Sequence, residues 1–254
     1  MIPKKQLIIL RTQKLRQTIN RHRYLYHVLD KQEISDAALD SLKRELAELE
    51  AEHPELVTPD SPTQRVGGGP LDKFAKVTHH VPQWSFNDAF TEGEMRAFDE
   101  RVEKGLGNTS YSYVCELKID GFKIVLTYKK GVLVNAATRG DGRVGEDVTK
   151  NIKTIESIPL KLERSVDIIV EGEIWISKKE FEKLNERQKK EGKELYANPR
   201  NVAAGTIRQL DSRVVAGRKL DSFIYDIAEY ATIPATQEEE LALLSELGFK
   251  VSKY

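Results

Sequence analysis

Cysteine is almost absent from this chain, and so is any long apolar run. One cysteine, Cys115, occurs in 254 residues, so no intramolecular disulfide can form, which is typical of proteins from a reducing compartment. The apolar run LIIL at residues 7–10 is far shorter than the roughly 20 residues of a transmembrane helix. No signal-peptide pattern is recognisable either. These absences predict a cytoplasmic location and no membrane partner.

An excess of either charge is also missing. Lys plus Arg and Asp plus Glu each number 40, so the formal net charge is zero. That balance excludes a generally basic, nucleic-acid-coating surface, although a local basic face is compatible with it. Hydrophobic residues make up 39% of the chain, which is enough for a packed core. The length allows one large domain or two smaller ones.

The first part of the chain has the pattern of a helical hairpin. Ser35 is placed to cap a second helix, and Pro54 forces its end. A hairpin of about fifty residues buries little surface by itself, so we expect residues 1–62 to form a small helical module that docks onto the rest of the chain. The apolar positions at helical spacing are Leu7, Leu10, Leu15, Ile19, Tyr26 and Leu29 in the first helix and Leu39, Leu42, Leu46 and Leu49 in the second.

Residues 63–254 are predicted to form a second domain of α+β class with antiparallel sheets. Turn-forming residues at 57–70 (VTPDSPTQRVGGGP) mark the linker that leads into it. Runs rich in Val, Ile and Tyr indicate strands. These are successive strands over residues 111–138 with a turn at 130–131, a strand pair over 166–176 and a strand over 221–230.

The helices of this domain are indicated by their caps. Two capping boxes pair a Thr or Ser with a Glu three residues later, and a further helix ends at Gly248. The caps are Thr91, Ser177 and Thr236. Three residues are predicted to lie in the core: Cys115, because it falls in a predicted strand, and the tryptophans Trp84 and Trp175.

The stretch ELKIDG, residues 116–121, places a lysine within a strand-like run. A free lysine amine has a pKa of about 10.4 and is charged at neutral pH, so a nucleophilic lysine needs neighbouring cations or a partly dry cleft. Asp120 can orient the amine, and Gly121 leaves bare backbone for a ligand to approach. Taken alone, the four-residue pattern Lys-x-Asp-Gly is more often a strand-end lysine beside an ordinary turn.

ELKIDG is not alone, because three further motifs come after it in order: TRGDG at 138–142, EGEIW at 171–175 and ANPRNVAAGTIRQLD at 197–211. HPELVTPDSPTQRVGG precedes it at 53–68. With these motifs the chain resembles the N-terminal and adenylation region of bacterial NAD-dependent DNA ligases over nearly all of residues 15–250. The resemblance implies a nucleotidyltransferase fold and a role in DNA replication and repair.

The implied reaction is adenylyl transfer. Lys118 attacks NAD, forms lysyl-AMP and expels nicotinamide mononucleotide; AMP then passes to the 5′-phosphate of nicked duplex DNA, and the 3′-hydroxyl displaces it. NAD and Mg²⁺ are the implied cofactors, although the sequence identifies no metal ligands. The chemistry requires the lysine in line with the leaving oxygen and guanidinium donors for the growing phosphate charge.

The resemblance also implies roles for the residues that match the family motifs. Glu116 contacts the adenine edge, and Asp120 contacts the ribose or the lysine. Arg139 faces the sugar or phosphate of the nucleotide, and Glu173 faces the ribose hydroxyls or a magnesium ion. Taken singly, Arg139 and Glu173 are each more often part of a surface or inter-strand ion pair.

Two further pairs match family positions. Ser85 and Phe86 fall where the family lines the adenosine pocket. Arg200 and Arg208 match arginines implicated in contact with DNA phosphates and in the later steps. Eight residues apart on a helix, the two arginines share a face. A solvated helix face is the alternative, but the small residues between them favour close approach of a phosphate.

In this family the helical module grips the nicotinamide half of NAD. Tyr26, His27, Asp36 and Asp40 occupy the matching positions, and aromatic rings and carboxylates suit a cationic pyridinium. Asp36 and Asp40 lie one turn apart on the same face. Without the resemblance, a packed tyrosine, a structural histidine and solvated acids are the simpler interpretation.

The chain departs from the family pattern at several positions. Leu39 stands where the family usually has a tyrosine, Glu171 where an arginine is common, and QWSFND at 83–88 replaces the usual MLSLDN. Other family features are not recognisable: the later lysine-bearing strand motifs, an OB-fold, a four-cysteine zinc element, helix-hairpin-helix repeats and a BRCT domain. The adenylation domain is therefore expected to be C-terminally incomplete.

Two explanations fit an incomplete domain: a shortened piece of a longer protein, or one subunit of a split, bacteriophage-like ligase acting in host cytoplasm. We favour the split enzyme, whose second subunit carries the remaining adenylation motifs, the OB-fold and the DNA-clamping domains. Two other functions remain as alternatives: a non-catalytic NAD- or DNA-binding scaffold derived from the ligase fold, and an ATP-dependent ligase or RNA-capping relative, which also uses K-x-D-G.

Overall fold

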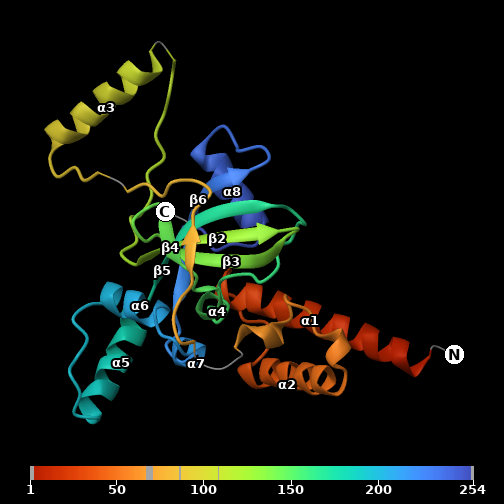
Figure 1. Cartoon of the computed structure of the whole chain (residues 1–254). Helices are drawn as coiled ribbons and strands as arrows, with labels where there is room; N and C mark the ends of the chain where they lie inside the picture. Colours follow the sequence, from red (N-terminus) through yellow and green to blue (C-terminus); the bar gives the residue numbers. More distant parts are fainter. Residues whose placement is uncertain (1–2, 67–70, 86, 108, 253–254) are drawn as a thin grey trace.

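The computed structural model describes residues 3–66, 71–85, 87–107 and 109–252. It contains a helical hairpin at one side and a four-stranded antiparallel sheet with helices around it (Figure 1). The α+β class predicted from the sequence is confirmed. None of the described helices combines the length and apolar character needed to span a membrane.

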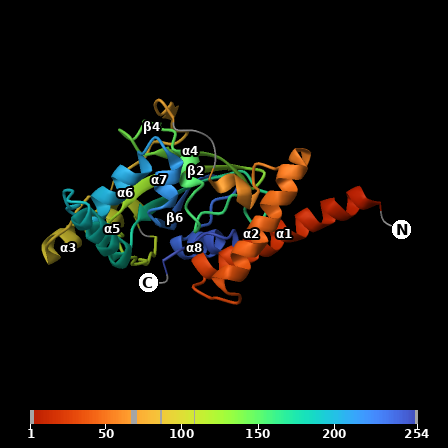
Figure 2. The same cartoon turned by 90° about the horizontal axis from the view of Figure 1, so that it is seen from below.

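The hairpin consists of α1 (Lys4–His27) and α2 (Asp36–Glu52). Their interface is the small apolar cluster predicted from the spacing: Leu15, Ile19 and Leu46 are at most 1% exposed. Ser35 caps α2, accepting a hydrogen bond from the backbone N–H of Ala38 at 3.2 Å. The N-terminal end of α1 extends past α2 (Figure 2). Leu7 and Leu10, the first two residues of the predicted apolar stripe, are exposed there.

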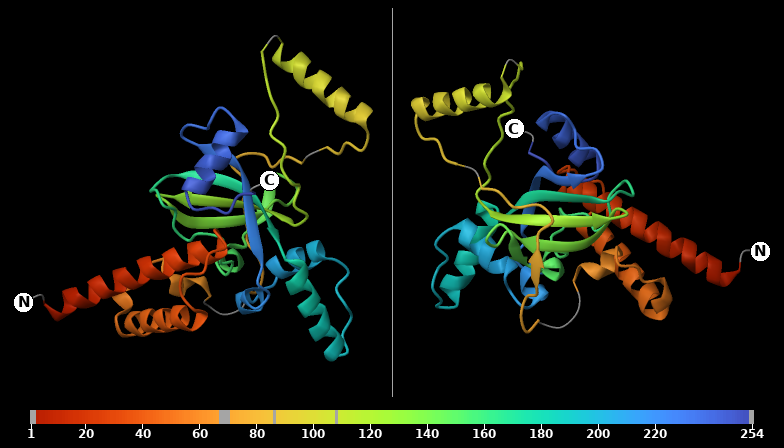
Figure 3. Two further views of the ribbon diagram at one scale, coloured as in Figure 1. Left: turned by 180° about the vertical axis from the view of Figure 1, so that it is seen from behind. Right: turned by 45° about the horizontal axis from the view of Figure 1, so that its top comes forward.

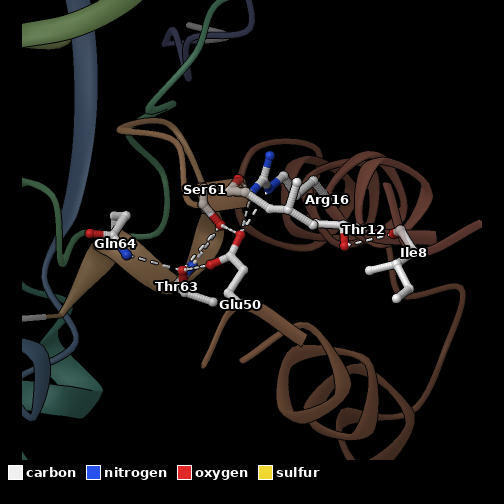
Figure 4. Close-up of polar contacts among 8 residues, drawn as sticks. Ile8, Thr12, Arg16, Glu50, Ser61, Thr63 and Gln64 are labelled. Carbon is white, nitrogen blue, oxygen red and sulfur yellow. Dashed lines mark hydrogen bonds and ion pairs between the residues drawn. The ribbon is translucent and has the colours of Figure 1, made fainter. Parts of the chain in front are cut away.

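A buried carboxylate ties the segment after α2 to the hairpin. Two short 3₁₀ turns, η1 (Pro54–Leu56) and η2 (Pro62–Arg65), come after α2. Glu50 accepts hydrogen bonds from the Arg16 guanidinium at 2.5 Å, from the Ser61 hydroxyl at 2.7 Å and from the Thr63 hydroxyl (Figure 4). Arg16 also donates to the carbonyl of Leu56. These donors make burial of the Glu50 charge tolerable.

The main sheet has the strand order β3-β2-β5-β6, with every pair antiparallel. The helices α4 (Thr149–Ile152), α5 (Lys178–Lys190), α6 (Pro199–Ile207), α7 (Ser212–Ala216) and α8 (Gln237–Glu246) surround it, and a small sheet pairs β1 (Lys76–Thr78) with β4 (Val144–Glu146). The strands of the main sheet are β2 (Phe122–Lys129), β3 (Val132–Thr138), β5 (Ile168–Trp175) and β6 (Asp221–Tyr230).

The two faces of the main sheet differ because side chains alternate along a strand. Ile124, Leu126 and Tyr128 of β2 point into the main core with Ile152 and Ile158, which come from α4 and the loop after it. The odd-numbered residues of β2 and β5 therefore face the other way. The two faces are called here the core face and the open face.

The helical module, together with η2 directly after it, docks onto the loop of residues 153–158 that covers the core face, called here the docking loop. Arg65 donates to three carbonyls of this loop, those of Lys153, Ile155 and Ile158, at 2.9–3.0 Å. Arg23 donates to the carbonyl of Glu156 at 2.5 Å. Burial, together with the neighbouring Arg65, lowers the pKa of Arg23 to about 9. The expectation that the hairpin docks onto the remainder is confirmed by these contacts.

The strand prediction is wrong for residues 111–121, which form no strand; only β2 and β3, joined by the predicted 130–131 turn, are strands in that region. The physical reason is pairing: a strand needs a neighbour for its N–H and C=O groups, and β2, the next element, already has β3 and β5 on its two sides. Cys115 is consequently exposed rather than in the core.

The helix α3 (Glu92–Leu106) projects away from the sheet, on the side opposite α1 and α2 (Figure 3). Its capping box of Thr91 and Glu94 is formed as predicted. Trp84, predicted to be a core residue, is 76% exposed because the segment leading to α3 leaves the sheet. Trp175 is half-buried and stacks on Phe223 with ring centroids 5.4 Å apart. Residues 166–176 contribute one strand, β5, and not a pair.

Glu50→Ala is predicted to destabilise the helical module by about 3 kcal/mol, because it leaves the half-enclosed Arg16 charge and two hydroxyls without their acceptor. Urea unfolding followed by circular dichroism measures this. Glu45→Ala is the matched control: the same two helices carry the exposed Arg11–Glu45 pair, for which about 0–1 kcal/mol is expected. Equal losses for the two variants would contradict a special role for Glu50.

Candidate active site

A cavity of about 790 Å³ lies on the open face of the main sheet. Its walls come from distant parts of the chain: the coil before β2, the turn between β3 and β4, the middle of β5, and α6. Six of the residues predicted to act on the nucleotide or DNA line it. They are Ser85, Lys118, Arg139, Glu173, Arg200 and Arg208.

Lys118 lies in the coil before β2 and is exposed to the cavity. The coil is held on both sides of the lysine. On one side, Gln237 of α8 donates to the Glu116 carboxylate at 3.0 Å and to the carbonyl of Tyr225 at 2.8 Å. On the other side, Arg200 donates to the Asp120 carboxylate at 3.1 Å. Glu116 itself does not line the cavity.

Gly121 lets the lysine segment lie directly against β5. A Cβ at this position would come within 2.3 Å of the carbonyl oxygen of Ile174 and 2.8 Å of Cγ of Glu173. Neither distance is tolerable, so only glycine allows this approach. The approach brings Glu173 next to the Lys118 segment.

The carboxyl of Glu173 is short of compensating charge. Its pKa is raised by burial, against the opposing effects of Lys118, Arg200, Lys123 and a hydrogen bond from the backbone N–H of Gly121. The alternative interpretation, a surface or inter-strand ion pair for each of Arg139 and Glu173, is not formed: among the described side chains neither residue takes part in a salt bridge. A carboxylate in this environment favours an approaching cation or hydroxyl donor.

The motif TRGDG forms the rigid turn that presents Arg139. Gly140 and Gly142 have positive φ angles of 59° and 93°, which glycine alone adopts without strain. The Asp141 carboxylate accepts from the backbone N–H groups of Arg143 and Val144, each at 2.8 Å. Within the described structure, Nε of Arg139 is buried without a hydrogen-bond partner, so the guanidinium retains unused donor capacity at the cavity wall.

Arg200 lies at the start of α6 and Arg208 directly after its end, so the two do not share a face of one helix as predicted, but both line the cavity. Each side chain is more than half exposed. Arg208 donates to the Glu146 carboxylate at 3.0 Å, and Lys76 lies 3.4 Å from the same carboxylate. The arginines are therefore oriented by acids but remain accessible to an anion.

A magnesium ion fits this site only in its usual hydrated form. No group of three or more candidate metal ligands occurs among the described side chains, so these residues form no all-protein cage. Mg²⁺ normally keeps several waters and binds through one or two carboxylates plus substrate phosphates. Of the acids that line the cavity, Glu173 is the one that is half-buried and has no ion pair among the described side chains, so it would hold the ion, and bound Mg²⁺ would neutralise phosphate charge there.

The four residues assigned to the nicotinamide half lie elsewhere. Tyr26 is 42% exposed and contacts the ring of His27 with centroids 4.8 Å apart. Burial lowers the pKa of His27 to about 4. Asp36 accepts from Gln32 at 3.2 Å, and Asp40 lies on the same helix. None of the four lines the cavity, because the helical module contacts the loop on the core face.

Phe86 lies outside the described residues, so its predicted contact with the adenosine is not placed. Several lining residues were not found by sequence reasoning: Trp84 at the cavity rim, Lys123 of β2, Glu146 of β4 and Tyr225 of β6. A charged residue at Lys123, inside the apolar run FKIVL, was the one available signal. The others depend on which strand ends meet in space.

Behind the cavity lies a pair of acids that share a buried position. Glu240 of α8 is 8% exposed, and burial followed by the neighbouring Asp226 raises its pKa to about 7. The pKa of Asp226 is also raised, by burial and by Glu171. Near neutral pH, Glu240 is thus divided between its protonated and charged forms.

Glu240→Gln is predicted to weaken the pH dependence of stability. A carboxyl whose folded pKa exceeds its unfolded value of about 4.3 stabilises the fold below that value, and the stabilisation is lost as the pH rises through the folded pKa of about 7. Urea unfolding at pH 5 and pH 8 should therefore differ less in the variant than in the wild type. Glu246→Gln, an exposed position at the end of the same helix, is the control, and an unchanged pH dependence in Glu240→Gln contradicts the prediction.

Residues 71–254 match the family model of the NAD-dependent DNA ligase adenylation domain, and residues 5–67 match that of the DNA ligase-like, N-terminal NAD⁺-binding domain. A DNA ligase of Halothermothrix orenii is 54% identical over 241 residues, 94% of this chain and 36% of that ligase. For the DNA ligases of Anoxybacillus flavithermus and Bacillus thuringiensis the identities are 52% over 240 residues and 48% over 250, or 94% and 98% of this chain and 35% and 37% of those ligases. The chain thus spans about a third of the length of these curated relatives. On both domain matches, it belongs to the NAD-dependent DNA ligase family.

Proposed function

We propose that this chain carries out the adenylyl-transfer step of an NAD-dependent DNA ligase. The observation that supports this most strongly is convergence: Lys118, Arg139, Glu173 and Arg200 come from four separate motifs and line one cavity. Convergence of a candidate nucleophile, a buried acid and two guanidinium groups suits transfer of a phosphoryl group.

The proposed step forms one bond and breaks one. The unprotonated Nζ of Lys118 attacks the α-phosphorus of NAD; a P–N bond forms as the bond to the bridging oxygen breaks, and nicotinamide mononucleotide leaves with that electron pair. The amine loses a proton to solvent or to Asp120, two residues further along the chain. Arg139 and Arg200 provide donors for the charge on the phosphate oxygens, and Glu173 binds the ribose hydroxyls or a hydrated magnesium ion.

The later steps use the same cavity. The adenylyl group passes from Nζ of Lys118 to the 5′-phosphate at a DNA nick, and the adjacent 3′-hydroxyl then displaces AMP. Arg208 and Arg200, accessible at the cavity mouth, are proposed to contact DNA phosphates. Such contacts position the backbone without reading its sequence.

The helical module, residues 1–62, is proposed to bind the nicotinamide half through Tyr26, His27, Asp36 and Asp40, and residues 63–254 to perform the transfer. Since the module docks on the core face while Lys118 lies on the open face, simultaneous grip of both halves of NAD requires the module to change position. The hydrogen bond of Arg23 to the docking loop is a contact that this movement would break, and those of Arg65 break as well if η2 moves with the module.

A second polypeptide is proposed to complete the enzyme. The support is the segment from residue 87 to residue 117, named here the arm. None of the described residues of α3 is buried. Exposed apolar side chains occur along the arm, including its last part, the coil before Lys118. They are Phe90, Met95, Phe98, Leu106, Tyr113, Val114 and Leu117. An apolar surface of this extent next to a reactive lysine suits a protein partner, and unpaired extended backbone suits an added strand.

Lys118→Ala and Lys118→Arg are predicted to abolish labelling by AMP, since neither offers a usable amine. Intact-mass measurement after incubation with NAD and Mg²⁺ should show one adenylyl group on the wild type and on Lys129→Ala, a control at the exposed end of β2. Absence of the adduct from the wild type, with NAD bound, would favour the non-catalytic scaffold. Labelling by ATP and not by NAD would favour the ATP-dependent alternative.

Met95→Glu with Phe98→Glu is predicted to weaken binding of the partner more than tenfold, because both charges fall on the apolar face of α3. The probe is the part of the Bacillus thuringiensis ligase beyond its matched 37%, tested by titration calorimetry and by nick sealing. Glu100→Lys with Glu103→Lys, two charge changes elsewhere on α3, is the control. Nick sealing by this chain alone, or equal binding by both double variants, would contradict the proposal.

A further inference from the structure

Lys123 is a cavity residue for which neither the motifs nor the proposed reaction gives a role. It lies on the open face of β2, paired in register with Glu173 of β5. Its side chain is 18% exposed and its ammonium lies 2.5 Å from the carboxylate of Glu171, which is 7% exposed. The two residues are diagonal neighbours across the β2–β5 pair. Because both groups are largely buried, separating them costs far more than separating an exposed ion pair, so the pair fixes the positions of both side chains.

Acidic side chains of β5 and β6 face Lys123. Glu171 and Glu173 come from β5, and Asp226 comes from β6; the ammonium lowers the pKa of both Glu173 and Asp226 against the larger effect of burial. Glu240 of α8 lies behind Asp226. Lys123 is thus a cation shared by several carboxyls, paired directly with Glu171 and opposing the effect of burial on Glu173 and Asp226.

The ammonium of Lys123 also holds the chain that forms the cavity rim. It donates to the carbonyl oxygen of Trp84 at 3.2 Å. The preceding residue, Gln83, is fixed by a backbone hydrogen bond to Gly142 at 2.8 Å. Among residues 84, 85 and 87–89, the bond from Lys123 is the one hydrogen bond that the described structure contains. Trp84 and Ser85 both line the cavity with Lys123.

We propose that Lys123 is a positioning residue for the nucleotide: clamped by Glu171, it fixes the Trp84 carbonyl and thereby the place of the Trp84–Ser85 wall against which the bound nucleotide packs. This role rests on the proposed adenylation function. It also gives the acid at position 171 a task, since Glu171 is the ion-pair partner that holds the ammonium in place. Lys123 transfers no proton and touches no reacting atom.

The test compares Lys123→Met with Lys129→Met, the same substitution at the exposed end of the same strand, where the lysine pairs with Asp167 at 3.3 Å. Lys123→Met should raise the KM for NAD in the AMP-transfer assay about tenfold, the effect of losing about 1.4 kcal/mol of binding, with a smaller change in kcat. In a Trp175→Phe background, which leaves Trp84 as the single tryptophan, the fluorescence anisotropy of Trp84 should fall. Lys129→Met should change neither quantity.

A charge-swapped double variant separates positioning from stability. Lys123→Glu with Glu171→Lys retains an ion pair, but a glutamate at 123 has no proton to donate to the Trp84 carbonyl. Urea stability should recover relative to Lys123→Met, whereas the KM and the anisotropy should stay altered. The proposal is overturned if the KM and the anisotropy both return to wild-type values in the double variant. It is also overturned if Lys123→Met is indistinguishable from wild type. A wild type that accepts no AMP counts against the proposed function instead, while the anisotropy comparison still decides the role of Lys123.

Discussion

The contact between the Lys118 segment and strand β5 is the constraint on which the site depends. The chain at Gly121 lies so close to the carbonyl of Ile174 that no side chain fits between them. This contact brings an amine from the coil before β2 and a carboxyl from β5 into one cavity, although more than fifty residues separate them in sequence. The cations Lys118, Arg200 and Lys123 then surround Glu173 and oppose the effect of its burial. Any change that lifts the coil from β5 removes the nucleophile and the counter-charge together.

Buried charges determine how the parts of this molecule are oriented. The overall charge is zero, yet Glu50, Arg65 and Glu171 are buried, and Lys123, the partner of Glu171, is largely buried. Each is met by specific donors or acceptors: hydroxyls and a guanidinium for Glu50, loop carbonyls for Arg65, and a carboxylate for Lys123. A displaced arrangement leaves such a charge without its partner, at a cost of about 3–5 kcal/mol. These charged groups therefore fix the relative positions of the elements that they join more strongly than an apolar contact of equal size does.

Local signals predicted the helical parts of the fold. The hairpin stripe at Leu15, Ile19 and Leu46, and the caps at Ser35 and Thr91, depend on residues a few positions apart, and the structure reproduces them. The region before β2 could not be predicted in this way. Its residues have strand-like composition, but a strand exists only where a neighbour has free N–H and C=O groups, and the pairing of β2 on both sides is a property of the whole sheet.

The candidate site shows the same division between local and long-range information. The motifs singled out Lys118, Arg139, Glu173, Arg200 and Arg208, because each motif is a short stretch of sequence, and the structure brings these five residues to one cavity. The supports of these residues were missed: Gln237, which holds the coil through Glu116, and Lys123, which holds the Trp84 carbonyl, become visible only when the strand register is known. The sequence also could not predict where Tyr26, His27, Asp36 and Asp40 lie relative to the cavity. Their position depends on which face of the sheet the helical module covers.

That position sets an energetic requirement on binding the dinucleotide. Four hydrogen bonds from Arg23 and Arg65 hold the module to the docking loop, and at about 1 kcal/mol net for each bond their loss costs on the order of 4 kcal/mol. A ligand shifts such an equilibrium only by the difference in its affinity for the two arrangements. In the proposed function, NAD has one half for the module and one for Lys118, so we propose that it binds better where both can reach it, whereas AMP has nothing to offer the module. On that proposal, the docked arrangement is the state expected after nicotinamide mononucleotide has left, when the cavity has to be open to DNA.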